Sequence, residues 1–423
     1  MDTPLTQAEF RNLLLPPRSA SAIAVAVSGG ADSLALTVVL GEYCLREGIS
    51  LTALTVDHGL RGDSAQEART VGSWLEKRGI AHVILKWQGD KPQSNIQDQA
   101  RLARYRLMGE WCQENDIARL FLGHHQGDQA ETFLIRLFRG SGIDGLSAMK
   151  IRSDFPVPLS GRGDITLHRP LLAVPKARLE ATLRHMNQPW IEDPSNQNET
   201  YTRIKVRNLL KQNDIEGLNA ERMAQTAARM GRVQSLLLSL TGDLTRQSVI
   251  YFPQAYAEVE LLPLLSAHEE IALRCLASLV RRIGGGKYTP RLMRLEALYD
   301  RLKTTGFSGQ TLGGCLISPL GDNRVMISRE VSAIDAIIDL EADREILWDG
   351  RFFVENRAIK GILQKLGSIS WRAVCGENPE LKKLKLHKAV RDSLPCIISD
   401  SGKVALPDFM PGFEKTGFKA TFK

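Results

Sequence analysis

The chain has 423 residues, of which 43% are hydrophobic, and this is enough apolar material for about three domain cores, so a disordered chain is excluded. Its 55 Lys and Arg residues against 48 Asp and Glu residues leave a net charge of +7, which favours a polyanionic partner such as nucleic acid. The sequence has neither a signal-peptide pattern nor an uncharged apolar run of about 18 residues, and we therefore expect a soluble cytoplasmic protein with no membrane partner.

The first 135 residues alternate between short apolar segments and amphipathic segments. The pattern predicts strands at 22–27, 50–57, 81–87 and 118–125, each followed by a helix, at 33–48, 63–79, 95–115 and 127–140. Such alternation indicates an α/β domain with a parallel sheet that is covered on both faces. In these sheets ligands bind at the carboxyl ends of the strands, and polar residues follow the predicted strands here: Ser28, Asp57, His58, His124 and His125.

The alternation stops near residue 150. A loop or hairpin at 154–164 precedes a helix that ends near residue 187, helical patterns dominate 217–305, and residues 310–330 indicate a β-hairpin. Short strand-like pieces follow, among them 345–356 and 368–374. We expect three domains: a catalytic domain at 1–215, a mainly helical domain at 216–330 and a small mixed α/β domain at 331–423.

The turn after the first predicted strand reads Ser-Gly-Gly-Ala-Asp-Ser, residues 28–33. A Walker A loop needs a Lys after its last glycine, and no Lys follows Gly30. The dinucleotide-type sequence GSGIDG at 140–145 follows a helical segment rather than a strand, so it does not fit that motif. The turn resembles instead the PP-loop of the ATP pyrophosphatase superfamily.

This turn suits a phosphate group. Gly29 and Gly30 allow a tight turn, the backbone N–H groups of the turn, Ala31 included, point to the phosphates together with the helix N-terminus, and Ser28 and Ser33 add hydroxyl groups. Asp32 would repel phosphate unless a cation lies between them, so we assign Asp32 to Mg²⁺. The alternative is a tight strand-to-helix turn in which Asp32 caps the helix.

Further motifs narrow the family. The segments VDHGLRGDSAQEA (56–68), GHHQGDQAETFLIRLFRGSGIDGLSAM (123–149), RPLL (169–172) and WIEDPSNQNETYTRIKVR (190–207) together resemble the tRNA(Ile)-lysidine synthase family over about the first half of the chain. The resemblance implies ligation of free L-lysine to C2 of the wobble cytidine (position 34) in the CAU anticodon of tRNA(Ile). The substrates would be ATP, lysine and the tRNA, the cofactor Mg²⁺, and the other products AMP and pyrophosphate.

The chemistry of the ligation explains why it needs ATP and why a carboxylate or His is expected near the lysine amine. The oxygen on cytosine C2 is no leaving group, so its adenylation turns it into departing AMP and splits a difficult step into two. The PP-loop would then hold the β and γ phosphates. An unperturbed lysine amine has a pKa of about 10.4, so presenting it as a neutral nucleophile at pH 7 costs about 4.6 kcal/mol, and we expect a carboxylate or His nearby.

Site candidates come from the strand ends and from one later helix. Asp57 and His58 are expected at the ATP site, with buried caps as the alternative. His125, Asp128 and Glu131 are expected to be catalytic; the two acids lie three residues apart and could bind the lysine ammonium, unless they only stabilise the start of a helix. Arg203 and Arg207, four residues apart, are expected to contact substrate phosphates.

Two features of the resemblance remain open. The family usually has two adjacent acids where this chain has Gly127 and Asp128, so the role of the first acid is unassigned. Arg101, Arg104 and Arg106 on the third predicted helix fit either a solvated surface or the site.

The second half of the chain resembles the family more weakly. It would bind the tRNA through phosphate contacts of exposed basic residues: Arg281, Arg282, Lys287, Arg291, Arg294, Lys382, Lys383, Lys385 and Lys388. The oligomeric state is open, with a homodimer as one option.

Three alternatives compete with this prediction. A PP-loop tRNA 2-thiolase would need paired cysteines, and the six cysteines here are far apart and form no C-x-x-C pair. An amidotransferase would need a glutaminase partner or domain. A non-catalytic tRNA-binding protein would not need the complete SGGADS sequence.

Overall fold

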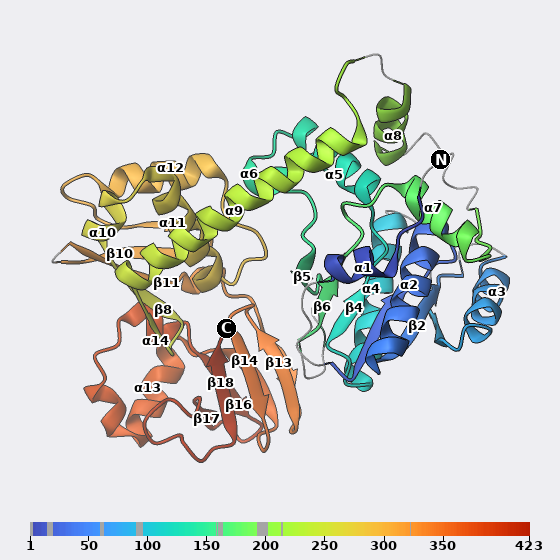
Figure 1. Cartoon of the computed structure of the whole chain (residues 1–423). Helices are drawn as coiled ribbons and strands as arrows, with labels where there is room; N and C mark the ends of the chain where they lie inside the picture. Colours follow the sequence, from blue (N-terminus) through green and yellow to red (C-terminus); the bar gives the residue numbers. More distant parts are fainter. Residues whose placement is uncertain are drawn as a thin grey trace. The chain divides into compact units, whose positions relative to one another are not determined.

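The computed structural model describes residues 3–14, 20–59, 63–89, 96–157, 159, 164–192, 202–212, 215–321 and 323–423. The chain forms two compact units, Met1–Ser235 and Leu236–Lys423, and the boundary falls within helix α9 (Ala220–Ser248) (Figure 1). The predicted division at residues 215 and 330 stays a prediction. No helix in the described ranges combines the length and the hydrophobicity that a membrane span requires.

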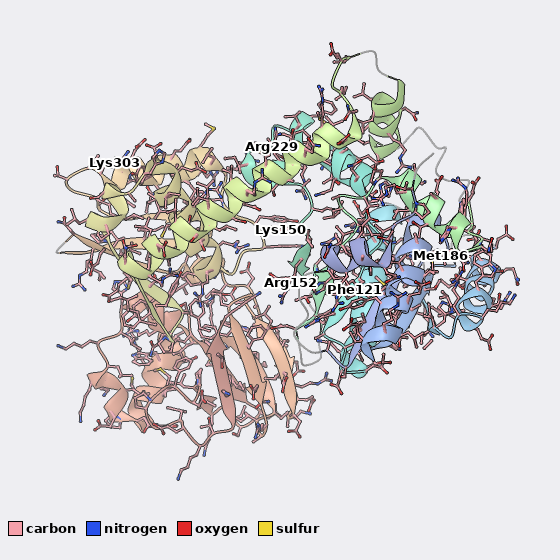
Figure 2. The ribbon with its side chains drawn as sticks, in the orientation of Figure 1. Phe121, Lys150, Arg152, Met186, Arg229 and Lys303 are labelled. Atoms are coloured by element: carbon pink, nitrogen blue, oxygen red, sulfur yellow. The ribbon has the colours of Figure 1, made fainter. Side chains whose placement is uncertain are left out.

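Unit 1 contains a six-stranded sheet whose order places the first strand at its centre. The order is β3 (Ala81–Lys86), β2 (Ser50–Asp57), β1 (Ala22–Ala26), β4 (Arg119–Phe121), β6 (Thr166–His168) and β5 (Arg152–Asp154). All neighbours pair in parallel except β5, which runs antiparallel to β6. Charged Arg152 lies on this edge strand (Figure 2), where a charge discourages pairing with another strand. The predicted parallel α/β sheet is confirmed.

Helices cover both faces of this sheet because residues of β1 alternate between two cores. Ile23 and Val25 pack in one cluster with residues of α1 (Gln7–Leu13), α2 (Ala31–Glu47), α3 (Ser64–Glu76) and α7 (Lys176–His185). Ala24 packs on the other face with residues of α4 (Ile96–Glu114). Helix α2 ends at Gly48, which adopts φ 69° and closes the helix as its C-cap.

A third cluster joins helices that follow the strands. Residues of α5 (Gln126–Phe138), α8 (Thr202–Gln212) and the first part of α9 pack together, with the short α6 (Ile143–Leu146) beside α5. This arrangement brings α8 close to the start of α5.

Unit 2 begins with a five-stranded antiparallel sheet. Its order is β7 (Val249–Phe252), β8 (Tyr256–Glu260), β11 (Arg324–Arg329), β10 (Cys315–Gly321) and β9 (Gln310–Leu312). Helices α10 (Leu261–Ser266), α11 (Glu269–Gly284) and α12 (Leu292–Leu302) share its core. The predicted β10–β11 hairpin is confirmed. Strands β7 and β8 were not expected from the sequence; they are short and are joined by a turn in which Ala255 has φ 59°.

The rest of unit 2 is built from two small sheets around one core. One has the order β12 (Ile338–Leu340), β15 (Gly361–Lys365), β16 (Pro395–Ser399) and β17 (Val404–Ala405), and the other β13 (Arg344–Trp348), β14 (Phe352–Asn356) and β18 (Phe418–Phe422). Residues 368–374, predicted to be strand-like, lie in helix α13 (Gly367–Glu377); that prediction is wrong. The reason is helical spacing, since Trp371, Val374 and Cys375 are the buried positions. Helix α14 (Lys388–Asp392) precedes β16.

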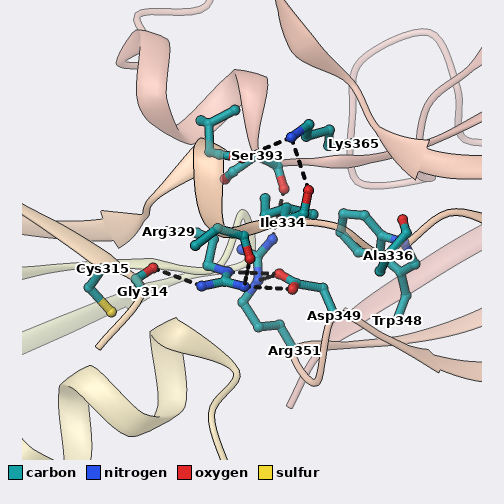
Figure 3. Close-up of polar contacts among 12 residues, drawn as sticks. Gly314, Cys315, Arg329, Ile334, Ala336, Trp348, Asp349, Arg351, Lys365 and Ser393 are labelled. Atoms are coloured by element: carbon teal, nitrogen blue, oxygen red, sulfur yellow. Dashed lines mark hydrogen bonds and ion pairs between the residues drawn. The ribbon is translucent and has the colours of Figure 1, made fainter. Parts of the chain in front are cut away.

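A buried ion cluster connects the two parts of unit 2. Asp349, in the turn between β13 and β14, accepts hydrogen bonds from Arg329 of β11 at 2.8 and 2.9 Å and from Arg351 at 2.6 Å (Figure 3). Arg351 is 0% exposed and also donates to the carbonyl oxygen of Ser393 at 2.8 Å. Burial lowers the pKa of Arg351 to about 10, against the opposing effect of Asp349. Asp349 therefore balances buried positive charge at the junction.

Candidate functional site

A cavity of about 580 Å³ opens at the carboxyl ends of β1 and β2 in unit 1. Its lining includes Ser28, Gly30, Asp32 and Ser33 after β1, Thr55, Val56 and His58 at the end of β2, Ser64 and Glu67 of α3, Arg101, Arg104 and Met108 of α4, and Gly123 and His124 after β4. The cavity thus lies at the sheet edge where the sequence predicted a ligand.

The turn between β1 and α2 leaves backbone donors free for an anion. Gly30 is the N-cap of α2 and makes no side-chain cap bond, so the first N–H groups of the helix have no intrahelical partner. Gly29 has φ +89°, and its carbonyl oxygen accepts a hydrogen bond from Ile191 N at 2.9 Å. Ser33 Oγ accepts from Ser28 N at 3.1 Å and so fixes the shape of the turn.

Gly123 lets the end of β4 approach this turn. A Cβ atom at position 123 would lie 2.8 Å from Ser33 Cα and 2.9 Å from the carbonyl oxygen of Asp32. These neighbours are backbone atoms of the first turn of α2, which cannot move without moving the helix. The side chains that follow β4 therefore lie next to Asp32.

Asp32 is a carboxylate that lacks a full set of partners. Its Oδ1 is buried and accepts no hydrogen bond from the described residues. Burial raises the pKa of Asp32, and the nearby charges of His125 and Lys176 oppose this shift. A buried carboxylate oxygen without a hydrogen-bond partner fits a cation, and Mg²⁺ is commonly bound by one or two carboxylates together with substrate phosphates.

His125 and Asp128 form the start of helix α5. His125 Nδ1 accepts from Gly127 N at 2.9 Å, and Asp128 Oδ2 accepts from His125 N at 3.0 Å, so both side chains cap the helix. His125 Nε2 also lies 3.5 Å from Asp32 Oδ2 and 3.7 Å from Asp128 Oδ2. Burial raises the pKa of Asp128, but His125 and this backbone hydrogen bond contribute to a net lowering. Asp128 therefore stabilises the start of α5, which was the alternative to a role in lysine binding, and it also lies close to His125.

The side chain of Glu131 forms its hydrogen bond with helix α8 and not with the start of α5. It is 2% exposed, and its Oε1 accepts from Arg207 Nε of α8 at 2.7 Å. Arg203 Nε lies 4.0 Å from Oε2, which has no hydrogen-bond partner among the described residues. Burial lowers the pKa of Arg207, but Glu131, with Asp128 and Asp32, outweighs burial and raises it. These carboxylates and Arg207 form one electrostatic cluster.

The remaining predicted site residues lie at the end of β2 and in the turn between β1 and α2. Asp57 accepts hydrogen bonds from Ser64 Oγ at 2.7 Å and Gly59 N at 3.0 Å; the Ser64 bond is the largest cause of its lowered pKa. Asp57 is not among the described residues that line the cavity, whereas His58 is. Gly29 and Ala31 support the turn from behind the lining: a Cβ atom at Gly29 would lie 2.9 Å from Val71, and Ala31 is buried.

Three further side chains belong to the site. Arg101 and Arg104 line the cavity, so they do not form the purely solvated surface that the sequence left open, and burial lowers the pKa of Arg104. Lys176, at the start of α7, is close enough to affect the pKa of Asp32. Lys176 lies four positions after the last residue of the RPLL motif, and this proximity is the sequence signal that could have marked it as a site residue.

His124 is half-buried and lines the cavity beside the buried His125. Its Nδ1 has no hydrogen-bond partner among the described residues, and burial lowers its pKa to about 3. His124 is therefore neutral at pH 7 and offers the cavity a polar ring without adding charge.

The similarity of the chain to known proteins points to one family. A family profile described as a PP-loop domain matches residues 3–213. The tRNA(Ile)-lysidine synthase of Wolbachia pipientis wMel is 38% identical over 394 residues, which cover 91% of this chain and 88% of that protein. The tRNA(Ile)-lysidine synthase of Ruegeria pomeroyi is 36% identical over 400 residues, covering 93% and 89%.

Among solved structures, the chain is similar to the U34-tRNA thiolase NcsA from Methanococcus maripaludis with its [4Fe-4S] cluster. It has a TM-score of 0.44 and 17% identity, and covers 54% of this chain and 77% of that chain. The two tRNA(Ile)-lysidine synthases match nearly the whole length of the chain. By this similarity the chain, with its PP-loop domain, belongs to the tRNA(Ile)-lysidine synthase family.

Proposed function

We propose that this protein ligates L-lysine to C2 of cytidine 34 in tRNA(Ile) with a CAU anticodon, through an adenylated tRNA, with release of AMP and pyrophosphate. One observation carries the proposal: the uncapped start of α2 and the unpartnered Oδ1 of Asp32 adjoin the acidic start of α5. A phosphate cradle, a cation ligand and an ammonium site are the three parts that the reaction needs.

ATP is the substrate that fits the cavity. The backbone N–H groups at 30–33 and the hydroxyls of Ser28 and Ser33 would hold the β and γ phosphates, which leaves the α-phosphate open to the cytidine oxygen. A volume of about 580 Å³ lies in the usual range for small-ligand pockets. Arg104 lines the same cavity and can balance negative charge there.

Asp32 would hold Mg²⁺, whose charge offsets the charge of the phosphates during transfer. The fit rests on the buried, unpartnered Oδ1. The protein contributes few ligands, since the described residues contain no group of three or more His, Cys, Asp or Glu side chains arranged to hold a metal. The phosphates and water would complete the coordination.

Lysine would bind at the start of α5. Asp128 Oδ2 and Oε2 of Glu131, which accepts no hydrogen bond from the described residues, are acceptors suited to an ammonium group. Glu131 keeps one oxygen bound to Arg207, so it is held in place while the other stays available. Arg203 has a half-exposed side chain and would contact an RNA phosphate.

The tRNA would contact unit 2 as well. The nine basic residues named in the sequence analysis are all exposed. Arg282 is partly engaged, since it stacks on Tyr251 with 4.2 Å between the guanidinium carbon and the ring centroid. A cytoplasmic location and a homodimer stay predictions, and light scattering on the purified protein tests the second.

A 2-thiolase is the less favoured alternative. All six cysteines are buried, and none is among the described residues that line the cavity. Burial raises the pKa of Cys44, Cys112, Cys315 and Cys396 to about 12, which disfavours a reactive thiolate.

Transfer of labelled lysine to RNA tests the proposal. Purified protein, ATP, Mg²⁺ and labelled lysine should label a tRNA(Ile) transcript with a CAU anticodon and should leave the same transcript with a GAU anticodon unlabelled. Equal labelling of both transcripts, or none of either, would contradict the proposed function.

A further inference from the structure

The first turn of helix α12, which packs beside α11 in unit 2 (Figure 1), is apolar but is not covered by the core. Leu292 lies three residues before the buried Leu295 and is 59% exposed, and Met293 beside it is 80% exposed. The buried positions of the helix follow the spacing of one helical face: Leu295, Leu298, Tyr299 and Leu302. The helix therefore begins beyond the core and presents two large apolar side chains to solvent.

Tyr288 lies just before this helix and is also 80% exposed. The segment that joins α11 to α12 is anchored at Pro290, whose ring lies against the turn between β9 and β10: a Cβ atom at Gly313 would lie 3.0 Å from Pro290 Cγ. Tyr288 and Leu292 flank this proline, two residues away on either side. The exposed apolar side chains therefore belong to one short stretch of chain that is held against the fold.

Basic side chains alternate with these apolar ones. Residues 281–295 contain five Lys and Arg residues and no Asp or Glu. Lys287 Nζ lies 5.8 Å from the centroid of the Tyr288 ring, so a cation lies beside the aromatic face. We call the exposed side chains of this stretch the α12 patch: Lys287, Tyr288, Arg291, Leu292, Met293 and Arg294.

The composition of the α12 patch indicates the chemistry of its partner. Exposed Lys and Arg side chains bind phosphates, and exposed aromatic side chains stack on nucleobases. A nucleic acid offers both groups, whereas an acidic protein surface would satisfy the cations alone. A duplex hides the faces of its bases except at its two ends, so the partner that best fits Tyr288 is an unpaired nucleotide.

We propose that the α12 patch binds unpaired nucleotides of the RNA substrate, with a base stacked on Tyr288 and the neighbouring phosphates held by the basic residues of the patch. This goes beyond the phosphate contacts of unit 2, because it gives an uncharged side chain a part in RNA recognition. The proposal rests on the proposed function only in taking an RNA as the partner.

Substitutions that separate stacking from charge test this role, with tRNA binding measured at several salt concentrations. Tyr288→Ala should weaken binding of the CAU transcript about 10-fold, as for loss of one stacked base, and should leave the slope of log affinity against log salt unchanged. Tyr288→Phe keeps the ring and should bind like the wild type. Arg291→Gln should reduce the slope by about 1, because it removes a phosphate contact.

Phe353→Ala is the matched control. Phe353 is an aromatic side chain of β14 in unit 2 that is 50% exposed, but Glu355, two residues later on the same face of the strand, places an acid beside it. This variant should leave tRNA affinity unchanged. Equal weakening by Tyr288→Ala and Tyr288→Phe, or by Tyr288→Ala and Phe353→Ala, would overturn the stacking role.

Two RNA duplexes test whether unpaired nucleotides are bound, one blunt and the other with an unpaired 3′ extension. Tyr288→Ala should weaken binding of the extended duplex more than binding of the blunt one, and equal weakening of both would contradict the proposal. A second copy of the chain is the other possible occupant of the patch. If light scattering shows that Tyr288→Ala abolishes self-association of the wild type while RNA affinity is unchanged, the proposal is overturned.

These binding measurements are separable from the proposed function. A wild-type protein that binds the transcript with the expected Tyr288 dependence but transfers no lysine would contradict the proposed function alone. A wild-type protein that transfers lysine, and whose tRNA affinity does not change in Tyr288→Ala, would contradict the stacking role alone.

Discussion

Asp32 lies in the turn at 28–33, and its buried Oδ1 accepts no hydrogen bond from the described residues. Asp32→Asn preserves the shape of the side chain and removes its charge. We expect pyrophosphate release to fall by at least about 100-fold while tRNA binding is retained, since the variant loses the cation ligand but no RNA contact. A pyrophosphate assay and a filter-binding assay check the two parts. Normal turnover in this variant would contradict the assignment of Asp32 as a ligand of Mg²⁺.

His168 carries a prediction about pH and stability. It stacks on Phe121 in β4, labelled in Figure 2, with ring centroids 4.9 Å apart, and burial lowers its pKa from 6.5 to about 4. Between these values the unfolded chain binds a proton that the folded chain does not bind. The stabilising contribution of neutral His168 is therefore complete above pH 6.5 and is lost as the pH falls towards 4.

Denaturant unfolding between pH 7 and pH 4 measures this effect. The free energy of unfolding of the wild type should decrease with falling pH, and His168→Gln should decrease less steeply over the same interval. His185, at the exposed end of α7, supplies the control: His185→Gln should leave the slope unchanged. Parallel slopes for His168→Gln and the wild type would contradict the expectation.

At the scale of the elements, the contact between the end of β4 and the first turn of α2 positions the site. Gly123→Ala would place a methyl group against backbone atoms at 2.8–2.9 Å. We expect the free energy of unfolding to fall by about 1–3 kcal/mol and ATP affinity to weaken, because the first turn of α2 must shift. Gly231→Ala is the control, since a Cβ atom there meets nothing within 4 Å. Equal effects of the two substitutions would show that the contact does not matter.

The junction in unit 2 gives a second prediction at this scale. Asp349 is the shared acceptor for two buried arginines, Arg329 and Arg351. Asp349→Asn should destabilise unit 2 by about 3–5 kcal/mol, because breaking a buried pair leaves charge uncompensated. Hydrogen exchange should show faster exchange in β11 and β14 with little change in unit 1. Unchanged exchange in these strands would mean that the cluster adds no stability.

The elements of unit 1 could be predicted because their periodicity and end signals agree. β2 was predicted at its observed bounds, and Gly48 ends α2 as expected of a C-cap glycine. β7 and β8 were not anticipated, since four and five residues carry little periodicity and their turn residue, Ala255, is not a usual turn former. The helix at 368–374 was missed because β-branched and aromatic residues there favour strands, while tertiary packing selects a helix.

From the sequence, the site could be predicted only as a set of residue types that follow the ends of strands, without the distances between their side chains. The sequence indicated Asp32, His125 and Asp128 but not that one imidazole faces both carboxylates, because that depends on the approach of α2 and α5. It also could not show that Asp57 bonds to its own loop, or that Arg104 turns into the cavity. Spacing along one chain does not fix distances between separate elements.

For the whole molecule, the net charge of +7 is expected to serve RNA binding. Lys382 and Lys383 are exposed in unit 2, and Lys383 pairs with Glu380 at 2.6 Å. Reversing both charges to Glu should raise KM for tRNA and reduce the slope of log affinity against log salt by about 1–2, while KM for ATP stays constant. Titration of tRNA binding at several salt concentrations measures the slope. An unchanged slope would show that these two lysines do not contact the tRNA.

The central claim is that the turn at 28–33 holds the outer phosphates so that the α-phosphate is transferred. Product analysis with ATP labelled at the α-phosphate in one reaction and at the γ-phosphate in a second reaction tests it most directly. With lysine and the CAU transcript, we expect one AMP and one pyrophosphate for each lysine joined to RNA, and little of either when the tRNA is omitted. Formation of ADP as the end product, or AMP release that does not depend on tRNA, would contradict the account.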